Sequence, residues 1–510
     1  MKDYKLLWGD FHTHLTDFDR GDEILEAASR NIDFTAVLCY PFVYEWKNGL
    51  HIESVKEKPE FAGWWKRLQE LCRTHHQPGR FVTFLGYEWH GNRTRYGDHN
   101  VIYFDETGPL DDAWTLEELY VHLKERRAIA IPHHTAYCPN WRSKNWDIFD
   151  ENLSPIMEIF SVHGSSEGCN TPLPLENNSS MGPRTTGGSF QDALARGYHI
   201  GVIGSNDGPG LPGRWGRGRA AVWATECTRE AIWEAILARR TYAVTGDRIE
   251  LKFQVAGAEM GSVTKVGGKI DAEVSVVGSG AIDRIELLQN GLVVDTYCHS
   301  GCWETKEAQP GRFKVFIEAG WGPAQSYGHK VEDWKWDFRL DISSGRIVGL
   351  EKCFTLSGQR VISLDESFAT WELLTAGRIT RNPFGMRQGL IFEIEGTGET
   401  ELGLKVEGLE MKFSAKDLLT GSHLIPLTQE SKERILRSFG LSEEDVVNPD
   451  TYYHNARKVK IHEAIPESGY RIAHTFKNLK LAPGRNSFYL RVSQLNGQLA
   501  WSSPIWVDAE

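Results

Sequence analysis

The feature that most constrains this chain is the stretch WGDFHTH at residues 8–14, which ends a short apolar run. Side chains two residues apart in a β-strand point to the same face, so His12 and His14 are expected to project together, with Asp10 on the same side. Two imidazoles with a carboxylate behind them make half of a metal site. The pair alone is weak evidence, because many buried histidines are simply satisfied by hydrogen bonds.

The first half of the chain, residues 1–248, alternates short apolar runs with helical patterns. This alternation is typical of parallel strands joined by crossover helices. The expected strands are KLLWGDFHTH, DFTAVLCY, FVTFLGYEWH, HNVIYF, AIAIPHH, IMEIFSVH and HIGVIGSND. The expected helices lie at residues 22–31, 61–77, 115–127, 189–197 and 228–240. We therefore predict a first domain of the α/β class.

The second half, residues 249–510, has a different pattern, with alternating strands, glycine-rich turns and little helix. The dipeptide Asn290-Gly291 between two such strands predicts a tight hairpin. A helical insertion is expected near residues 430–465. At 510 residues the chain is too long for one ordinary core. We therefore predict a second, β-rich and sandwich-like domain over residues 249–510.

Histidines and carboxylates gather at the ends of the expected strands of the first half. In barrels of parallel strands the chemistry lies at the carboxyl ends of the strands. The residues at these ends are His12, His14, Glu88, His90, His99, His133, His134, His163 and Asp207. Imidazole combined with carboxylate suits zinc, manganese or iron, and the lack of paired thiolates argues against a purely structural zinc.

Several of these residues have a second interpretation. His90 follows Trp89 and is either a rim residue, a general acid or a ligand. Of His133 and His134, only one is expected to share a face with the strand, and His134 is favoured. Glu158 is expected to orient a ligand rather than to bind metal. Cys39 is expected to be a buried small hydrophobic residue.

Five stretches of the first half, GDFHTH, GYEWHG with GDHNVIYF, IPHH, EIFSVHGSSE and GSNDG, resemble the PHP (polymerase and histidinol phosphatase) superfamily. The chain is more closely similar to an uncharacterised bacterial PHP-like family with a C-terminal β domain, through REAIWEAILARRTYAVTGDRIEL and YLRVSQLNGQLAWSSPIW. The resemblance covers nearly the whole chain. It implies a distorted (β/α)7 barrel with metals at the carboxyl ends of the strands, and hydrolysis of phosphate esters.

Carried over residue by residue, the resemblance assigns seven metal ligands: His12, His14, Glu88, His99, His134, His163 and Asp207. Two motifs depart from the family pattern. The TDH motif is replaced by Leu38-Cys39-Tyr40, and the late D-x-H motif is Asp207-Gly208-Pro209. Because three ligand positions are altered, we expect one or two divalent ions (Mn, Zn or Fe) rather than three. Asp17 or Asp19 is an open alternative for a further carboxylate.

The first functional hypothesis is a metal-dependent hydrolase, with a phosphoesterase acting on a small organic phosphate ahead of other hydrolases. Arg214, Arg217 and Arg219 follow Asp207 and are suited to clamp a phosphate or carboxylate, although a solvated loop explains them equally well. Tyr40 stands where the family has a ligand histidine, so it is a candidate donor of a proton or hydrogen bond.

Two other hypotheses stay open. The altered ligand positions also suit a metal-dependent enzyme whose substrate is sugar-like, an ester or an amide. Alternatively, the first domain is a degenerate shell and the protein binds carbohydrate or a partner. Glu88 and Asp207 beside five histidines argue against full degeneration, because unpaired carboxylates in a closed site are costly without a cation.

The overall composition limits the classes of partner that we expect the protein to bind. A net charge of -12 argues against non-specific nucleic-acid binding. The sequence has no apolar run near 18 residues, no signal-peptide pattern, and eight scattered cysteines without a CxxC motif. We therefore expect a cytoplasmic protein with a small-molecule substrate and no nucleic-acid or membrane partner. The β-rich domain is expected to flank the barrel or to form a homo-oligomer interface.

Overall fold

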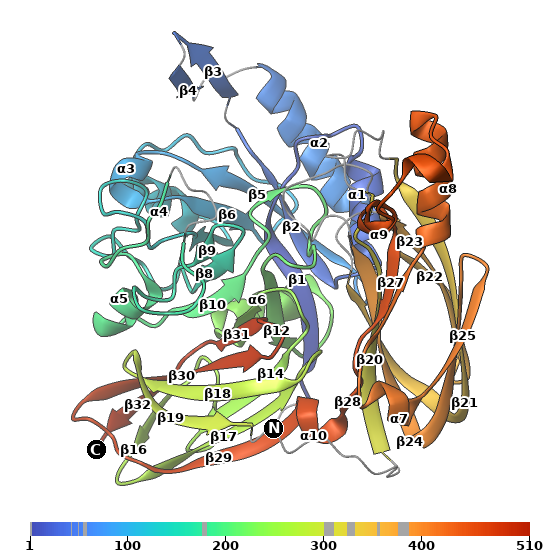
Figure 1. Cartoon of the computed structure of the whole chain (residues 1–510). Coiled ribbons are helices and arrows are strands. Elements are labelled where there is room, and N and C mark those ends of the chain that lie inside the picture. The colour runs from blue at the N-terminus through green and yellow to red at the C-terminus, as the bar shows by residue number, and fades with distance from the viewer. Residues whose placement is uncertain are drawn as a thin grey trace. The chain divides into compact units, whose positions relative to one another are not determined.

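The structure is a computed structural model that describes residues 3–41, 43–48, 50–54, 59–175, 181–299, 311–323, 332–353, 358–375 and 387–510. The described chain is mixed α/β and rich in strands (Figure 1). Its contacts divide it into two compact units. The first unit contains Met1–Val276, Asp283–Cys298 and Ala473–Glu510, and the second contains Val277–Ile282 and His299–Ile472.

All five helices expected in the first half are present in the first unit. They are α1 (Gly21–Ser29), α2 (Pro59–His75), α4 (Leu116–Lys124), α5 (Phe190–Ala195) and α6 (Arg229–Leu237). Side chains at their starts explain the boundaries, since Thr115 and Ser189 form capping boxes and Thr228 accepts a hydrogen bond from the Ala231 N–H. The short helix α3 (Arg93–Tyr96) was not expected.

The expected strands of the first half are also present, but one runs in the opposite direction. In the largest sheet, β1 (Lys5–His14), β2 (Phe34–Cys39) and β5 (Val82–Trp89) are parallel neighbours, whereas β6 (His99–Tyr103) is antiparallel to both β5 and β7 (Ala128–Pro132). Only residues 90–98 join β5 to β6, which is too short for the crossover that a parallel pair needs. The start of β6 therefore lies at the same sheet edge as the ends of β1, β2, β5 and β7.

The described strands form open sheets, so the expected closed (β/α)7 barrel is not found among them. The path of the largest sheet ends at β7, and β8 (Ile156–Ser161) pairs instead with β10 (Gly201–Gly204) and β9 (Gly164–Ser165) in a separate three-stranded sheet. The hairpin β3 (Val43–Lys47) and β4 (Leu50–Ser54) forms a sheet of its own. The structure therefore has a mixed α/β fold that is rich in strands.

The far end of the largest sheet is built from the C-terminus of the chain. Beyond β1 the order continues through β12 (Arg219–Ala224), β13 (Thr241–Val244), β31 (Leu499–Ser502), β30 (Arg485–Gln494), β32 (Ile505–Ala509) and β16 (Val263–Val266). A hairpin of β18 (Ile282–Gln289) and β19 (Leu292–Cys298) pairs with β30. Its Asn290-Gly291 turn has φ values of 53° and 80°, as the predicted tight turn requires.

Four strands of the first unit form a smaller sheet in the order β15 (Ala258–Glu259), β14 (Glu250–Val255), β17 (Ile270–Val277) and β29 (Arg471–Leu479). In β17, alternate side chains from Ile270 onward are buried, so one face of this sheet packs on the core. The predicted boundary at residue 248 stays a prediction, since the first unit draws on residues from both sides of it.

The second unit is organised around a nine-stranded sheet whose described pairs are all antiparallel. Its main path is β22 (Arg360–Leu364), β23 (Phe368–Thr375), β21 (Trp334–Cys353), β24 (Gln388–Val406), β20 (Gly311–Gly320), β27 (Lys458–Ile461) and β26 (His423–Pro426), and β25 (Leu409–Ser414) and β28 (Ile465–Pro466) pair at its sides. The expected insertion contains α8 (Thr428–Phe439) and α9 (Asp450–His454).

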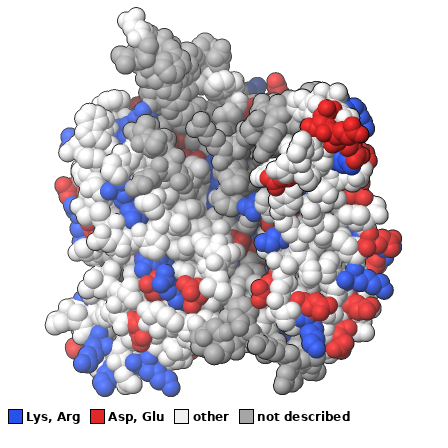
Figure 2. All heavy atoms as spheres, viewed as in Figure 1, with Lys and Arg blue, Asp and Glu red and all other residues white. Residues whose placement is uncertain are grey.

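Two further properties concern the partners. Within the described residues, every helix is too short or too polar to cross a lipid bilayer. Figure 2 shows lysine and arginine side chains interspersed with aspartate and glutamate over the visible face, so the described residues of that face carry no continuous basic surface.

A buried carboxylate attaches the C-terminal strands to the rest of the first unit. Glu167 Oε1 accepts hydrogen bonds from Tyr489 Oη at 2.9 Å and from Arg491 Nη1 at 2.8 Å, and Glu167 Oε2 accepts one from Trp501 Nε1 at 2.8 Å. Arg491 also donates to Glu286. Because Glu167 is fully buried, these bonds are shielded from water and removing the charge leaves Arg491 undercompensated.

We predict that Glu167→Gln lowers the free energy of unfolding of the first unit by about 3 kcal/mol, since it breaks one side of a buried ion pair. Urea unfolding followed by tryptophan fluorescence measures this as a lower midpoint at unchanged slope. The matched control is Glu23→Gln, whose partner Arg20 and own side chain are both more than half exposed. Equal midpoints for the two variants would contradict the prediction.

Candidate metal centre

The two histidines of β1 lie side by side, as their spacing predicts. His12 Nε2 and His14 Nε2 are 3.2 Å apart. The pairing of β1 with β2 shifts register between Asp10 and Thr13, an irregularity of the kind that often re-aims side chains next to active sites. Glu88 from β5 joins them, with Oε2 at 2.7 Å from His14 Nε2 and 3.7 Å from His12 Nε2. These three residues form one group of possible metal ligands.

A second group of possible ligands shares His12 with the first group. It consists of His12, His133, Glu158 and Asp207, all buried. Asp207 Oδ1 lies 3.5 Å from His12 Nε2, and Glu158 Oε2 lies 2.7 Å from His12 Nδ1. Glu158 thus touches the ring nitrogen that faces away from the first group, which is the position of a residue that orients a ligand.

A third group contains His134, His163 and Asp207. Asp207 Oδ2 lies 3.3 Å from His163 Nε2 and accepts a hydrogen bond from Ser161 Oγ at 3.2 Å. The other nitrogen of His163 is held by Tyr137, whose hydroxyl lies 2.6 Å from Nδ1. Asp207 therefore belongs to both the second and the third group and links them.

His133 and His134 both belong to groups of possible metal ligands, although the alternation of a strand would place only one of them on a shared face. β7 ends at Pro132, and His134 has a φ of 35°, in the left-handed region. The strand alternation therefore stops before the histidines, and the turn brings their rings to 4.3 Å from one another. Asp207 has a φ of 50°, and strained backbone of this kind clusters at functional sites.

A fourth group, Glu88, His90 and Asp98, lies at the outer side of Glu88. His90 Nε2 is 2.5 Å from Glu88 Oε1, and its Nδ1 is 3.2 Å from Arg93 Nη1. A guanidinium can only donate, so His90 Nδ1 accepts a hydrogen bond from Arg93. His90 Nε2 therefore carries the proton and donates a hydrogen bond to Glu88. Asp98 is paired with Arg142. His90 is buried, and its assignment as a general acid stays a prediction.

His99 stands apart from these four groups in the described residues. Its ring packs against Trp89, the residue opposite it across β5 and β6, with centroids 5.7 Å apart. Asp98, one residue earlier, lies instead 3.3 Å from His134 Nε2. The reversed direction of β6 explains why the residue before the strand meets the centre. Sequence reasoning missed Asp98 and Arg142, and only the reversal of β6 could have pointed to Asp98.

The electrostatics of the centre are those of carboxylates held among imidazoles. Burial favours neutral forms, yet the charges of Asp207 and Glu158 raise the pKa of His12 well above its usual value. Burial likewise opposes ionisation of Glu88 and Asp207, but neighbouring histidines hold the pKa of both carboxyl groups below its usual value. Burial lowers the pKa of His163 to about 4 and that of His133 far below normal.

The residues fit a divalent metal. Both ring nitrogens of His133 are buried and have no hydrogen-bond partner in the described structure, although they lie beside carboxylates. Buried ring nitrogens without hydrogen bonds cost free energy, and a cation bound by one of them would offset part of that cost. Ligand atoms at about 2.1 Å from one ion lie roughly 3.0–3.4 Å apart, and the distances above fall around that range. Neutral imidazole with carboxylate is a donor set for several metals, so it does not select one.

The residues expected beside the ligands also lie near them. The Tyr40 ring packs on His14 at 4.8 Å and on His90 at 5.5 Å between centroids. Cys39 is buried, and burial raises the pKa of its thiol to about 12, which does not favour a thiolate ligand. Asp10 is hydrogen-bonded to backbone N–H groups rather than placed in the four groups.

The arginines after Asp207 form a half-buried loop at the centre. Arg217 Nη1 lies beside Gly208, where an added Cβ would be 3.0 Å away. Burial lowers the pKa of both guanidinium groups, that of Arg214 to about 10 with Arg217 beside it. Among the described residues neither guanidinium has an ion-pair or hydrogen-bond partner, whereas Arg219 is buried and donates to Gly213 O.

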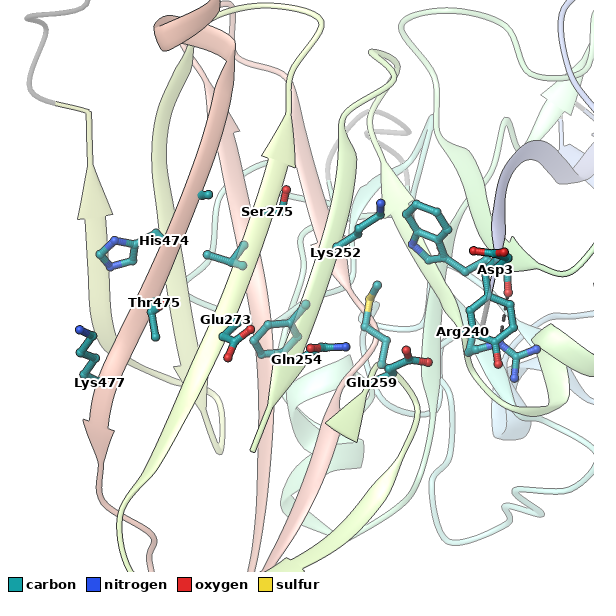
Figure 3. A pocket seen from close by; sticks show the side chains of 16 residues that line it. Asp3, Arg240, Lys252, Gln254, Glu259, Glu273, Ser275, His474, Thr475 and Lys477 are labelled. Carbon is teal, nitrogen blue, oxygen red and sulfur yellow. Dashed lines mark hydrogen bonds between the residues drawn. The ribbon is translucent and has the colours of Figure 1, made fainter. Parts of the chain in front are cut away.

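A separate cavity of about 770 Å³ opens on the first unit over β14, β17 and β29 (Figure 3). Its lining includes Trp223, Arg240, Lys252, Glu259 and His474, and no member of the four ligand groups lines it. Its charged side chains are spread along an open sheet face rather than gathered on one point. The buried groups of histidine and carboxylate are therefore the better candidate for a chemical site.

Comparisons with known proteins find partial matches to proteins without an assigned activity. A family model described as "protein of unknown function (DUF3604)" matches residues 25–135 and 214–267, which is less than half of the chain. An uncharacterised protein of Chlamydia pneumoniae is 27% identical over 256 residues, and one of Chlamydia muridarum is 25% identical over 324 residues. These alignments cover 46% and 58% of this chain, but the chain spans only 40% and 49% of the relatives' own lengths.

The chain is also weakly similar to a solved structure. That structure is a two-domain protein from Bacteroides vulgatus that contains a predicted PHP-like metal-dependent phosphoesterase. It is 16% identical, covers 56% of this chain and 79% of its own, and superposes with a TM-score of 0.32. A score this low establishes no common fold, so the case for function depends on the geometry of this chain's own residues.

Proposed function

We propose that this protein is a metal-dependent hydrolase and that its substrate is a small organic phosphate ester. The observation that carries the proposal is the cluster of buried imidazoles and carboxylates, with orphaned His133 nitrogens, beside two half-buried guanidinium groups. The cluster suits divalent cations, and the guanidinium groups suit an anion. A site that offers both is suited to phosphate esters.

The chain would hold metal at two neighbouring places. His12, His14 and Glu88 would form one, and His134, His163 and Asp207 would form the other. The group of His12, His133, Glu158 and Asp207 links them, because it shares His12 with the first and Asp207 with the second. Divalent ions bound there would supply Lewis-acid polarisation of water and of a phosphoryl oxygen. Glu158, Tyr137 and Ser161 would orient the ligands through the hydrogen bonds described above. We assign manganese, zinc or iron as the metal.

Arg214 and Arg217 would bind the phosphoryl group, because they are partly desolvated cations. Among the described residues no carboxylate is hydrogen-bonded to either guanidinium, although the charges of Asp207 and Asp10 act on Arg217. The Tyr40 hydroxyl would donate a hydrogen bond to the substrate at the His14 side of the centre. His90 would act mainly on Glu88, whose carboxylate it touches, with proton donation to the leaving group as its alternative role.

We extend the proposal to partners and location on weaker support. The net charge of -12 and the mixed charges of Figure 2 favour a small-molecule substrate without nucleic acid. A cytoplasmic protein without a membrane partner, a first domain of the distorted (β/α)7 type, and a role of the β-rich domain in flanking that domain or in homo-oligomer contacts all remain proposals.

The metal site is tested by Asp207→Asn, because Asp207 is shared by two ligand groups. We expect purified wild-type protein to contain one or two equivalents of manganese, zinc or iron by plasma mass spectrometry. Loss of the shared ligand should weaken reloading of the chelator-treated protein at least about tenfold. Asp22→Asn is the matched control, since Asp22 is an exposed carboxylate that pairs with Arg67 and His75. Folded wild-type protein that takes up none of these ions would contradict the proposal.

The phosphate specificity is tested by Arg217→Gln. We expect KM for a phosphate monoester and the inhibition constant of inorganic phosphate to rise about tenfold or more, because a charged hydrogen bond worth about 1.5–3 kcal/mol is lost. Metal content should stay unchanged, and Arg20→Gln, at an exposed position, should behave as wild type. Hydrolysis of sugar-like, ester or amide substrates but of no phosphate ester would transfer the proposal to that class.

A further inference from the structure

Asp10 joins the three segments that carry the candidate site. Its side chain is fully buried. Oδ1 accepts hydrogen bonds from the backbone N–H of His12 at 2.9 Å and of Asn206 at 3.2 Å. Oδ2 accepts one from the Thr13 hydroxyl at 2.7 Å and one from the Gly213 N–H at 2.9 Å. One carboxylate thus contacts the strand of the histidine pair, the residue before Asp207, and the loop of the arginines.

These four bonds use the acceptor capacity of a carboxylate, which has about four lone-pair sites. Asp10 therefore has no free lone pair for a metal ion or a substrate. The same count explains why a carboxylate is needed. In asparagine, one of the two oxygens becomes an NH2 donor, which would face either the His12 and Asn206 N–H groups or the Thr13 and Gly213 donors. In the first orientation the NH2 opposes two buried N–H donors. In the second it opposes the Gly213 N–H, while the Thr13 hydroxyl can turn to accept from it. Either orientation therefore opposes at least one buried backbone donor.

Two of the segments joined by Asp10 contain left-handed backbone conformations, which need support from their surroundings. Asp207 has a φ of 50°, and Gly213 has a φ of 64°. The Asp207 N–H also donates to His12 O at 2.7 Å, and Arg219 Nε donates to Gly213 O at 2.8 Å. Both the N–H and the C=O of Gly213 are thus hydrogen-bonded, immediately before Arg214.

We propose that Asp10 is a positioning residue that couples the metal-binding strand, the Asp207 turn and the arginine loop into one unit. The roles of the ligands and arginines in this inference rest on the proposed function, but the coupling itself does not. Asp10 would set the distance between the place for metal and the place for phosphate through the Gly213 N–H and the Asn206 N–H. Without its charge, the loop that carries Arg214 and Arg217 would loosen relative to β1.

The coupling is tested by hydrogen exchange with mass spectrometry on the protein as purified, wild type beside Asp10→Asn. We expect amide exchange to become about tenfold faster or more in three separate peptides, covering residues 9–15, 203–209 and 211–219. The matched control is Asp33→Asn, because Asp33 Oδ2 accepts the Trp8 N–H at 2.7 Å, two residues before Asp10 in the same strand, and in the described residues neither the Asp207 turn nor the arginine loop is hydrogen-bonded to Asp33. Asp33→Asn should speed amide exchange near residue 8 and leave exchange in the peptides covering residues 203–209 and 211–219 unchanged.

Two results would overturn the inference. Faster exchange confined to residues 9–15 would make Asp10 a local support of its own strand. Equally faster exchange in all peptides of the first unit would make it a general contributor to stability. If Asp10→Asn does not fold, Thr13→Val removes one donor of the same network. Thr13→Val should speed exchange at residues 9–15 and 203–209 by a smaller factor, since Asn206 Nδ2 also contacts the Thr13 hydroxyl. Unchanged exchange rates in these two peptides would count against the coupling through Asp10.

A cobalt titration separates this inference from the proposed function. Cobalt(II) added to chelator-treated protein reports binding through its visible absorption, and Asp10→Asn should weaken it about 10–100-fold while Asp33→Asn does not. Equal cobalt affinity in wild type and Asp10→Asn would overturn the positioning role. Failure of wild-type protein to bind cobalt would count against the metal site, and the exchange experiment would still decide on Asp10.

Discussion

The candidate site depends on the burial of negative charge. Glu88 in β5, Glu158 in β8 and Asp207 after β10 lie in the interior, where an isolated carboxylate would cost several kcal/mol. Imidazole groups from four other segments surround them, and each carboxylate lies within ion-pair distance of at least one histidine. The arrangement satisfies these polar groups only in part, because neither ring nitrogen of His133 has a hydrogen-bond partner in the described residues, although Nε2 lies 3.6 Å from Glu88 Oε1. A bound cation would offset part of the remaining cost.

The direction of the strands explains how these side chains meet. β1, β2, β5 and β7 end at one edge of the sheet, and the reversed β6 begins there. Candidate ligands therefore come from the ends of β1, β5 and β7, and from the residue before a strand in the case of Asp98. A single reversed strand changes which residue faces the centre, and it separates Asp98 from His99 although they are neighbours in the chain.

The segments that carry Asp207 and His134 lie outside regular secondary structure and are held by polar contacts. Asp207 and His134 adopt left-handed backbone conformations that side chains other than glycine rarely take. Hydrogen bonds from Asp10, Ser161 and Tyr137 fix these segments, and Glu167 ties the C-terminal strands into the same unit. Packing alone would not hold such conformations, since hydrophobic contacts are non-directional.

The sequence by itself determined what depends on local periodicity. The five helices of the first half, its strands, the Asn290-Gly291 turn and the pairing of His12 with His14 all follow from spacings of two to four residues and from capping side chains. Only the tertiary structure decided the reversal of β6, the entry of both His133 and His134, and the open sheets completed by the C-terminal strands. These features depend on strand pairing and left-handed turns, whose energies come from partners distant in the sequence that no local pattern records.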